Sequence, residues 1–98
     1  MAVHRAGEKS DDLLQSSRIL LDNARKAVAA CGQRADVLQF LADEVEGKQI
    51  IARMQREAHV LSRICEVAPD RRREAERLMG ECARVWTGIA TAKPWAWR

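Results

Sequence analysis

Hydrophobic residues recur along this chain with the period of an α-helix, in three stretches separated by turn signals. In the first stretch, spacings of three and four residues separate Leu14, Ser17, Leu21, Ala24, Val28 and Cys31. This spacing marks one face of a helix, and it continues for about three heptads, as in a coiled coil. Ser10, which precedes two acidic residues, is a favourable N-cap. We therefore predict a helix over residues 11–31, with Leu14, Leu21 and Val28 in its interface, after a flexible lead-in over residues 1–9.

The second stretch carries two apolar stripes that are slightly out of phase. One stripe contains Val37, Leu38, Leu41 and Val45, and the other contains Ile51, Met54, Ala58, Leu61, Cys65 and Ala68. Gly47 lies at the join. Because a glycine inside a helix costs only about 1 kcal/mol relative to alanine, we favour one continuous helix over residues 36–68. A break at Gly47 would instead give four helices. Ile51, Met54 and Leu61 are the predicted interface residues of this helix.

The third stretch follows Pro69, which disfavours helical backbone in the residue before it and so ends the second helix. Its seam consists of Ala75, Leu78, Cys82, Val85 and Ile89. The pattern predicts a helix over residues 71–91 that ends before Pro94, with Leu78, Val85 and Trp86 in its interface. Residues 93–98 form an aromatic tail.

These elements predict an all-α fold, an elongated antiparallel three-helix bundle with coiled-coil-like seams, as one domain over residues 10–92. The composition agrees, since the chain is 47% hydrophobic and 32% charged and contains two prolines and no tyrosine. The central helix would be longer than either neighbour, so part of its apolar stripe is expected to remain uncovered. That expectation favours a second helical chain, either a partner or another copy in a homo-oligomer.

The net charge of +3 comes from the C-terminal third, where the segment RRREAER spans residues 71–77. Arginines in the first turn of a helix oppose the helix dipole. Ion pairs with glutamates three or four residues away would produce a solvated, partly paired face. Alternatively, Arg71, Arg72 and Arg73 would contact an acidic partner or phosphate groups. Binding to nucleic acid is possible on this pattern but not favoured.

The sequence contains no familiar nucleophile, phosphate-loop, dinucleotide or metalloprotease motif, so we predict no enzyme and no cofactor. The two histidines, His4 and His59, have no ligand partner at short spacing, so no metal site is predicted. Cys31, Cys65 and Cys82 fall on apolar stripes and are expected to be buried free thiols in a reducing compartment. No apolar run approaches the ~20 residues of a membrane span, and no signal peptide is visible. We expect an intracellular protein, cytoplasmic or nuclear.

The tail, KPWAWR, contains two of the three tryptophans. In an extended tail the indoles of Trp95 and Trp97 would face the same side. They would cover the chain's own bundle, anchor in a partner as interface tryptophans often do, or, as a third alternative, lie at a membrane surface. The leading hypothesis is a non-enzymatic helical interaction subunit, an adaptor or assembly component. The alternative is a small module that binds nucleic acid or phosphate through the basic C-terminal third.

Overall fold

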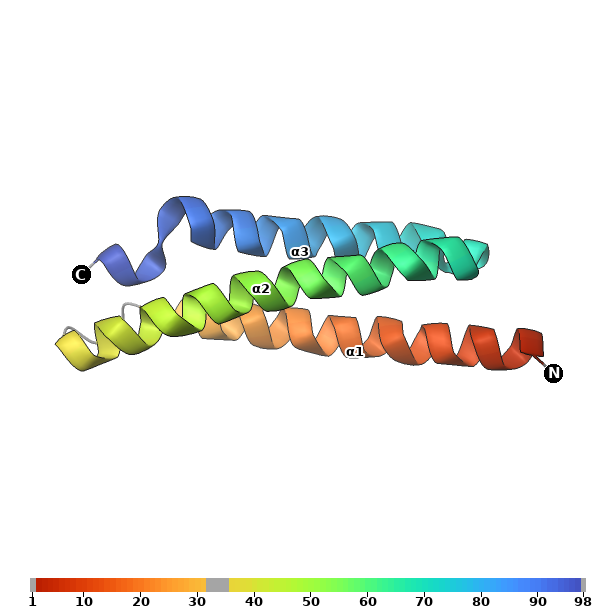
Figure 1. The fold of residues 1–98 in the computed structure, drawn as a ribbon, viewed down its shortest axis with the longest axis horizontal. Coiled ribbons are helices and arrows are strands. Elements are labelled where there is room, and N and C mark those ends of the chain that lie inside the picture. Colours follow the sequence, from red (N-terminus) through yellow and green to blue (C-terminus); the bar gives the residue numbers. More distant parts are fainter. Residues whose placement is uncertain (1, 32–35, 98) are drawn as a thin grey trace.

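The computed structural model describes residues 2–31 and 36–97, with side chains over residues 9–31 and 36–96. Its helices are α1 (Ala2–Ala30), α2 (Val37–Val67) and α3 (Arg72–Ala92), with short 3-10 helices η1 (Pro69–Arg71) and η2 (Pro94–Trp97). α1 and α3 run in the same direction and α2 runs opposite to both (Figure 1). The predicted all-α, three-helix bundle is confirmed.

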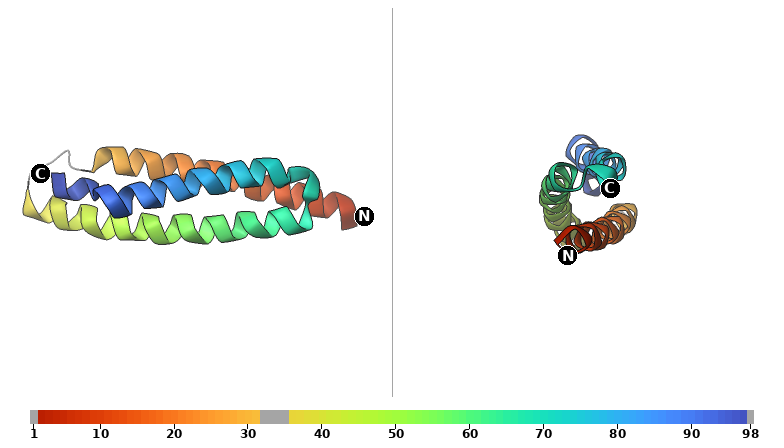
Figure 2. Two further views of the ribbon diagram at one scale, coloured as in Figure 1. Left: turned by 90° about the horizontal axis from the view of Figure 1, so that it is seen from above. Right: turned by 90° about the vertical axis from the view of Figure 1, so that its right-hand side faces the viewer.

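The bundle is long and narrow. Its principal extents are 55 × 20 × 15 Å, and its radius of gyration is 15.8 Å, against about 13 Å for a compact domain of this length. Viewed end on, α2 lies between α1 and α3 (Figure 2). α2 and α3 pack closely along their lengths, and α1 packs more loosely on both.

The predicted seam of α1 is confirmed, but the start of the helix is not at residue 11. Leu14, Leu21 and Ala24 are buried, and Val28 is partly buried against the same core. The helix begins at Ala2, so residues 2–9 are helical rather than a separate lead-in. Ser10 is not an N-cap but a buried residue inside the helix. The physical reason is periodicity, since Ser10 lies four residues before Leu14 and occupies the next seam position.

α2 begins at Val37, directly after Asp36, which caps the helix by accepting a hydrogen bond from the Gln39 N–H at 2.8 Å. The helix is continuous through Gly47, as favoured, and Met54 and Leu61 are fully buried while Ile51 is half-buried. The first of the two apolar stripes faces away from the core, in line with the expectation that part of the apolar surface of this helix stays uncovered. The side chains of Val37, Leu38, Leu41 and Val45 are 73%, 80%, 49% and 56% exposed.

The seam of α2 instead follows a strict alternation of spacings of four and three residues. Its positions are Asp43, Gly47, Ile50, Met54, Glu57, Leu61, Ile64 and Ala68. Asp43 is buried at this seam and accepts a hydrogen bond from the Gln39 side-chain amide at 2.8 Å. The residues that the core requires near the start of α2 are therefore small or polar, which is why the apolar stripe beside them seemed out of phase.

α3 is continuous through its two glycines and ends at Ala92, as the pattern predicts. Leu78 is buried, and Val85 and Trp86 are half-buried against the core. The chain then reverses at Lys93, whose φ of 45° is left-handed and whose N–H donates to the Ile89 carbonyl at 2.8 Å. This αL cap turns η2 back toward the bundle, so the tail is helical rather than extended.

The predicted mismatch in helix length takes a different form. α1 has 29 residues and α2 has 31, so their lengths are similar, but they are shifted along the bundle axis. The first turns of α1 project beyond η1, and the start of α2 projects beyond the end of α1 (Figure 1). The uncovered part of the central helix is therefore its N-terminal end, where the exposed apolar side chains lie.

Candidate functional site

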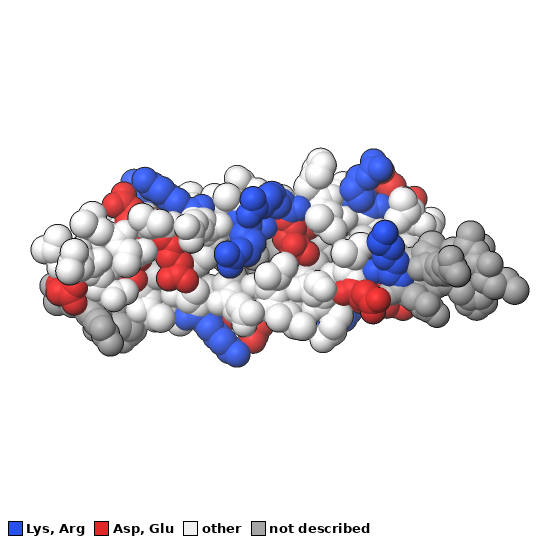
Figure 3. Space-filling model, turned by 60° about the horizontal axis from the view of Figure 1, so that its bottom comes forward, with Lys and Arg blue, Asp and Glu red and all other residues white. Residues whose placement is uncertain are grey.

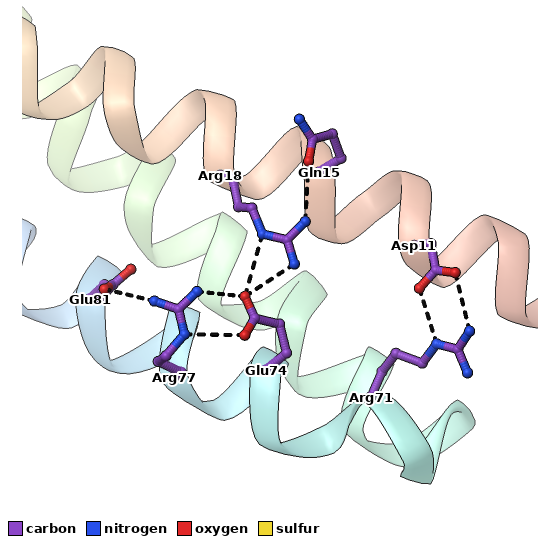
Figure 4. Close-up of polar contacts among 7 residues, drawn as sticks. All are labelled: Asp11, Gln15, Arg18, Arg71, Glu74, Arg77 and Glu81. Atoms are coloured by element: carbon purple, nitrogen blue, oxygen red, sulfur yellow. Dashed lines mark hydrogen bonds and ion pairs between the residues drawn. The ribbon is translucent and has the colours of Figure 1, made fainter.

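Three ion pairs connect α1 to η1 and α3, and the first two of them are drawn in Figure 4. The pairs are Asp11 with Arg71, Arg18 with Glu74, and Arg25 with Glu81, at 3.0, 3.1 and 3.7 Å. The α1 members are spaced by heptads, so they lie on one line along the helix. We call this line the α1–α3 ion-pair row. It fixes the axial register of α1 against α3 over the first half of their contact.

The basic segment at residues 71–77 is largely engaged within the chain. Arg71 also contacts Asp70, Arg72 pairs with Glu76 at 2.8 Å, and Arg77 bridges Glu74 and Glu81. Arg73 is exposed, and among residues 9–31 and 36–96 it has no ion pair. The predicted partner-binding role of Arg71 and Arg72 conflicts with these contacts, because both guanidinium groups already contact carboxylates.

Acidic and basic side chains are interleaved along the face shown in Figure 3. Interleaved charges give weak net fields at a distance, since opposite charges screen one another. Binding to phosphate backbones depends on the collective positive charge of several lysines or arginines. This face therefore lacks the surface that such binding needs.

The ion pairs lower the pKa of two carboxyl groups. The hydrogen bond from Arg71 is the main cause for Asp11, and the hydrogen bond from Arg77, with a smaller contribution from Arg18, is the main cause for Glu74. Both shifts favour the charged form, as expected for exposed carboxylates beside guanidinium groups. For Asp11 the shift comes from the contact between α1 and η1, whereas for Glu74 most of it comes from Arg77 of the same helix.

Beyond the last ion pair, α1 and α3 leave an apolar groove between them. Its volume is about 370 Å³. Most of the apolar lining comes from Val28, Ala29, Val85, Gly88, Ile89 and Ala92, and Pro94 completes it. Arg25 and Arg84 contribute to the wall at the end nearest the ion-pair row. No residue of α2 lines this α1–α3 groove, so the groove opens on the side of the bundle away from α2.

A second apolar surface lies on α2. We call Val37, Leu38, Leu41 and Val45 the exposed α2 stripe. Leu41 and the buried Ile50 are nine residues apart, which at 3.6 residues per turn places them on opposite faces of the helix. The exposed α2 stripe therefore points away from the core and from the α1–α3 groove.

The aromatic tail docks on its own bundle. Trp95 is only 5% exposed, and its ring lies directly over Gly47 of α2. A Cβ at residue 47 would lie 2.0 Å from Cζ3 of this ring, far inside contact distance. Trp95 thus fills the seam position that Gly47 leaves vacant. A partner anchor at Trp95 is wrong for this conformation, and the side chain of Trp97 lies outside the described residues.

A polar pair lies inside the bundle near its middle. Ser17, fully buried, donates a hydrogen bond to the Glu57 carboxylate, so the pair connects α1 to α2. Burial raises the pKa of the Cys82 thiol to about 11, with Glu57 and Glu81 adding to the shift. A thiol with such a pKa is a poor nucleophile at neutral pH. The hydrogen bond between Ser17 and Glu57 fixes the register of α1 against α2. Neither this pair nor the Cys82 thiol supplies a reactive group.

The cysteine and histidine side chains, which could bind a metal or react, do not form a site together in the described part of the chain. Among the described residues, no cluster of histidine, cysteine and acidic side chains has the proximity to hold a metal ion. The thiols of Cys31 and Cys82 are buried, as predicted, whereas Cys65 is only partly buried. His59 is exposed on α2, and the side chain of His4 lies outside the described residues. Within the described ranges, no helix has the length and apolar character that crossing a membrane requires.

Comparisons of this chain with protein-family models, with curated proteins and with solved structures find no match.

Sequence reasoning predicted uncovered apolar surface on the central helix, but it did not locate that surface and did not predict the groove. The sequence identified the exposed α2 stripe as apolar but did not define which way it faces. The α1–α3 groove depends on where two helices separate, and the only local signal is the change along α3 from glutamates at residues 74 and 81 to the small residues Gly88 and Ala92 on the same flank.

Proposed function

We propose that this protein is a non-enzymatic helical interaction subunit that binds another helical chain through its exposed apolar surfaces. The observation that carries the proposal is the exposed α2 stripe: four large aliphatic side chains on two consecutive turns, each about half exposed or more. Single exposed hydrophobic residues are common on protein surfaces, but contiguous apolar patches mark interaction sites. An amphipathic helix in a partner would cover such a stripe with apolar residues at helical spacing.

The α1–α3 groove supports the same proposal. Its apolar walls come from two parallel helices, and its rim residues Ala29, Gly88 and Ala92 are small and exposed. Small side chains let a third helix approach two others closely, as ridges pack into grooves. A bound helix would bury Val28 and Val85, which are only half-buried in the single chain.

The alternative, a module that binds nucleic acid or phosphate, has less support. Arg71, Arg72 and Arg77 are paired with carboxylates of the same chain. An incoming phosphate would have to replace those carboxylates. The two functions differ in salt dependence, because phosphate binding weakens steeply with salt and apolar packing does not.

Loss of binding on polar substitution of the exposed α2 stripe tests the proposal. The variant Leu38→Gln/Leu41→Gln removes two apolar side chains from the stripe. The matched control Gln55→Ser/His59→Ser changes two exposed residues farther along the same helix. Each tagged protein is compared with wild type for its mass in solution and for the proteins it retains from an extract of the source cells.

We expect wild type and control to bind a chain, either another copy or a different helical protein, and the stripe variant to lose it. All three should melt at similar temperatures, since the substituted side chains are exposed. If the three proteins show the same mass and retain the same proteins in the same amounts, the proposed function is wrong.

A further inference from the structure

We propose that the α1–α3 groove is the docking site for the exposed α2 stripe of a second copy of this chain. This inference rests on the proposed function and names its partner. The two surfaces lie on opposite sides of the bundle, the stripe on the outer face of α2 and the groove between α1 and α3. Copies would therefore associate head to tail, with each groove occupied by the start of the next copy's α2.

The two surfaces match in length. From Val37 to Val45, the stripe extends about 12 Å at 1.5 Å per residue. On α3, the groove runs from Arg84 to Ala92, which is also about 12 Å. The stripe on the incoming helix therefore spans the same length as the groove.

Their charges are opposite. Residues 36–46, which carry the stripe, contain four acidic residues, of which Asp43 is buried and Glu44 pairs with Lys48 of the next turn. Residues 25–30 and 84–94, which form the groove walls, contain four basic residues and no acidic residue; two of the four, Arg25 and Lys26, pair within the chain. Arg84, Lys93 and Glu46 are exposed and form no ion pair with the described residues of their own chain. Complementary potentials of this kind guide association and set register.

This charge distribution also has an explanation within a single chain. Acidic residues near the start of α2 and basic residues near the ends of α1 and α3 interact favourably with the helix dipoles. That effect gives no reason for aliphatic side chains between the acids. In the single chain, Val37 and Leu38 remain more than 70% exposed. Docking in a second copy buries them, so it accounts for the aliphatic side chains that the helix dipoles leave unexplained.

A head-to-tail contact has a diagnostic behaviour, because its two surfaces can be disabled separately. Leu41→Glu places a charge at the centre of the stripe, with Gln55→Glu as a control that adds the same charge on the same helix. Gly88→Leu fills the groove. A Cβ at residue 88 has no heavy atom within 4 Å, and the same is true of Gly80, so Gly80→Leu is the matched control outside the groove.

Sedimentation velocity of the full chain over a wide concentration range, with melting curves for every variant, measures the outcome. We expect wild type and both controls to form species that grow beyond two chains as concentration rises. Leu41→Glu and Gly88→Leu should each remain at the chain mass of 11.1 kDa, with association weakened about thirtyfold or more, as for hot-spot residues. An equimolar mixture of these two variants should form a species of two chains and no larger one.

The mixture is decisive because one variant retains an intact groove and the other an intact stripe. If wild type associates but the mixture does not, another surface mediates association and this inference is wrong. If wild type stays monomeric at every concentration, the second copy is not the occupant. In that case the retention of a different helical protein, and its loss in the Leu38→Gln/Leu41→Gln variant, still decides the proposed function separately.

Discussion

Gly47→Ala should destabilise the protein in the presence of Trp95 and stabilise it in its absence. The added methyl group would lie 2.0 Å from Cζ3 and 2.8 Å from two other atoms of the indole ring. Neither the helix backbone nor the buried ring can move far enough to relieve such overlap, so Trp95 must leave its site. The substitution therefore removes the tail from the bundle by a change made at a residue 48 positions earlier.

The magnitude follows from two opposing contributions. Truncating a buried large aromatic side chain costs about 3–5 kcal/mol, and Trp95 is only 5% exposed. Replacing glycine by alanine inside a helix gains about 1 kcal/mol. We expect Gly47→Ala to lower the free energy of unfolding by about 2–4 kcal/mol, leaving a folded protein if the total lies in the usual range of about 5–15 kcal/mol. Each kcal/mol corresponds to a shift of about 4–8 °C in the melting temperature at this size.

A double-mutant cycle with Trp95→Ala tests this reasoning, because it removes the ring before the methyl group is added. In the Trp95→Ala background, Gly47→Ala should raise stability by about 1 kcal/mol, so the sign reverses. Gly80→Ala is the control: its Cβ meets open space, and it should stabilise both backgrounds equally. Urea denaturation gives the four free energies. A Gly47→Ala substitution that destabilises the Trp95→Ala background as much as wild type would refute the role of the ring.

Three further predictions concern the thiols, the helix cap and the ion-pair row. Under native conditions at pH 8, a thiol reagent should modify the partly buried Cys65 first and the buried Cys31 and Cys82 only slowly. Cys82 is 1% exposed, and burial raises the pKa of its thiol to about 11. Equal modification rates for all three cysteines would contradict this packing. Lys93→Gly should raise the melting temperature by roughly 4–8 °C, because glycine relieves about 1 kcal/mol of left-handed strain at φ 45°; an unchanged melting temperature would show that the cap is unstrained. The pKa of Glu74 is lowered by its arginine partners, so its contribution is present above the unfolded pKa and lost as pH falls through the folded one. Glu74→Gln should therefore be less stable than wild type by about 0.5–1 kcal/mol at pH 7, and the difference should close as pH falls below about 4; a difference that persists at pH 2 would exclude the carboxylate charge as its cause.

The fold was predictable because its main determinants are local. The spacing of Leu14 and Leu21 in the first helix, and of Leu78 in the third, is enough to place those residues in the core. Pro69 and Pro94 mark helix ends through the chemistry of the proline ring. The start of α1 was harder, because Ser10 resembles a cap in isolation and is a seam residue only when the helix continues before it.

The phase of α2 was not predicted, for a physical reason. Its seam passes through Gly47, which has no side chain of its own to show in a hydrophobic pattern. The space beside Gly47 is filled by the ring of Trp95, which comes from the C-terminal tail. Hydrophobic patterning detects large apolar residues and so followed Leu41 instead. The strict spacing gave a usable signal: stepping back from Met54 by four and then three residues reaches Ile50 and Gly47 and leaves Leu41 on the outer face.

The ion-pair row shows a similar limit. Sequence spacing identified pairs within one helix, such as Arg77 with Glu81, because three or four residues suffice to align them. The pairs between helices need the axial register of α1 and α3, which local spacing does not define. Yet Arg18 and Arg25 are seven residues apart, as are their partners Glu74 and Glu81. Two equal heptad spacings of opposite charge are a pattern that can be sought in advance.

The tail connects the stability of the bundle to its proposed docking surface. Pro94 lines the α1–α3 groove, while the next residue, Trp95, fills the seam at Gly47. Releasing the ring therefore also displaces one wall of the groove. If copies associate through that groove, Gly47→Ala should weaken association as well as folding, although Gly47 lies on neither surface. Conversely, an occupied groove should hold Pro94 in place and raise the stability of the docked tail, because a ligand stabilises the conformation that it binds. Trp95 completes the core, and its burial sets the shape of the surface that a second copy would meet.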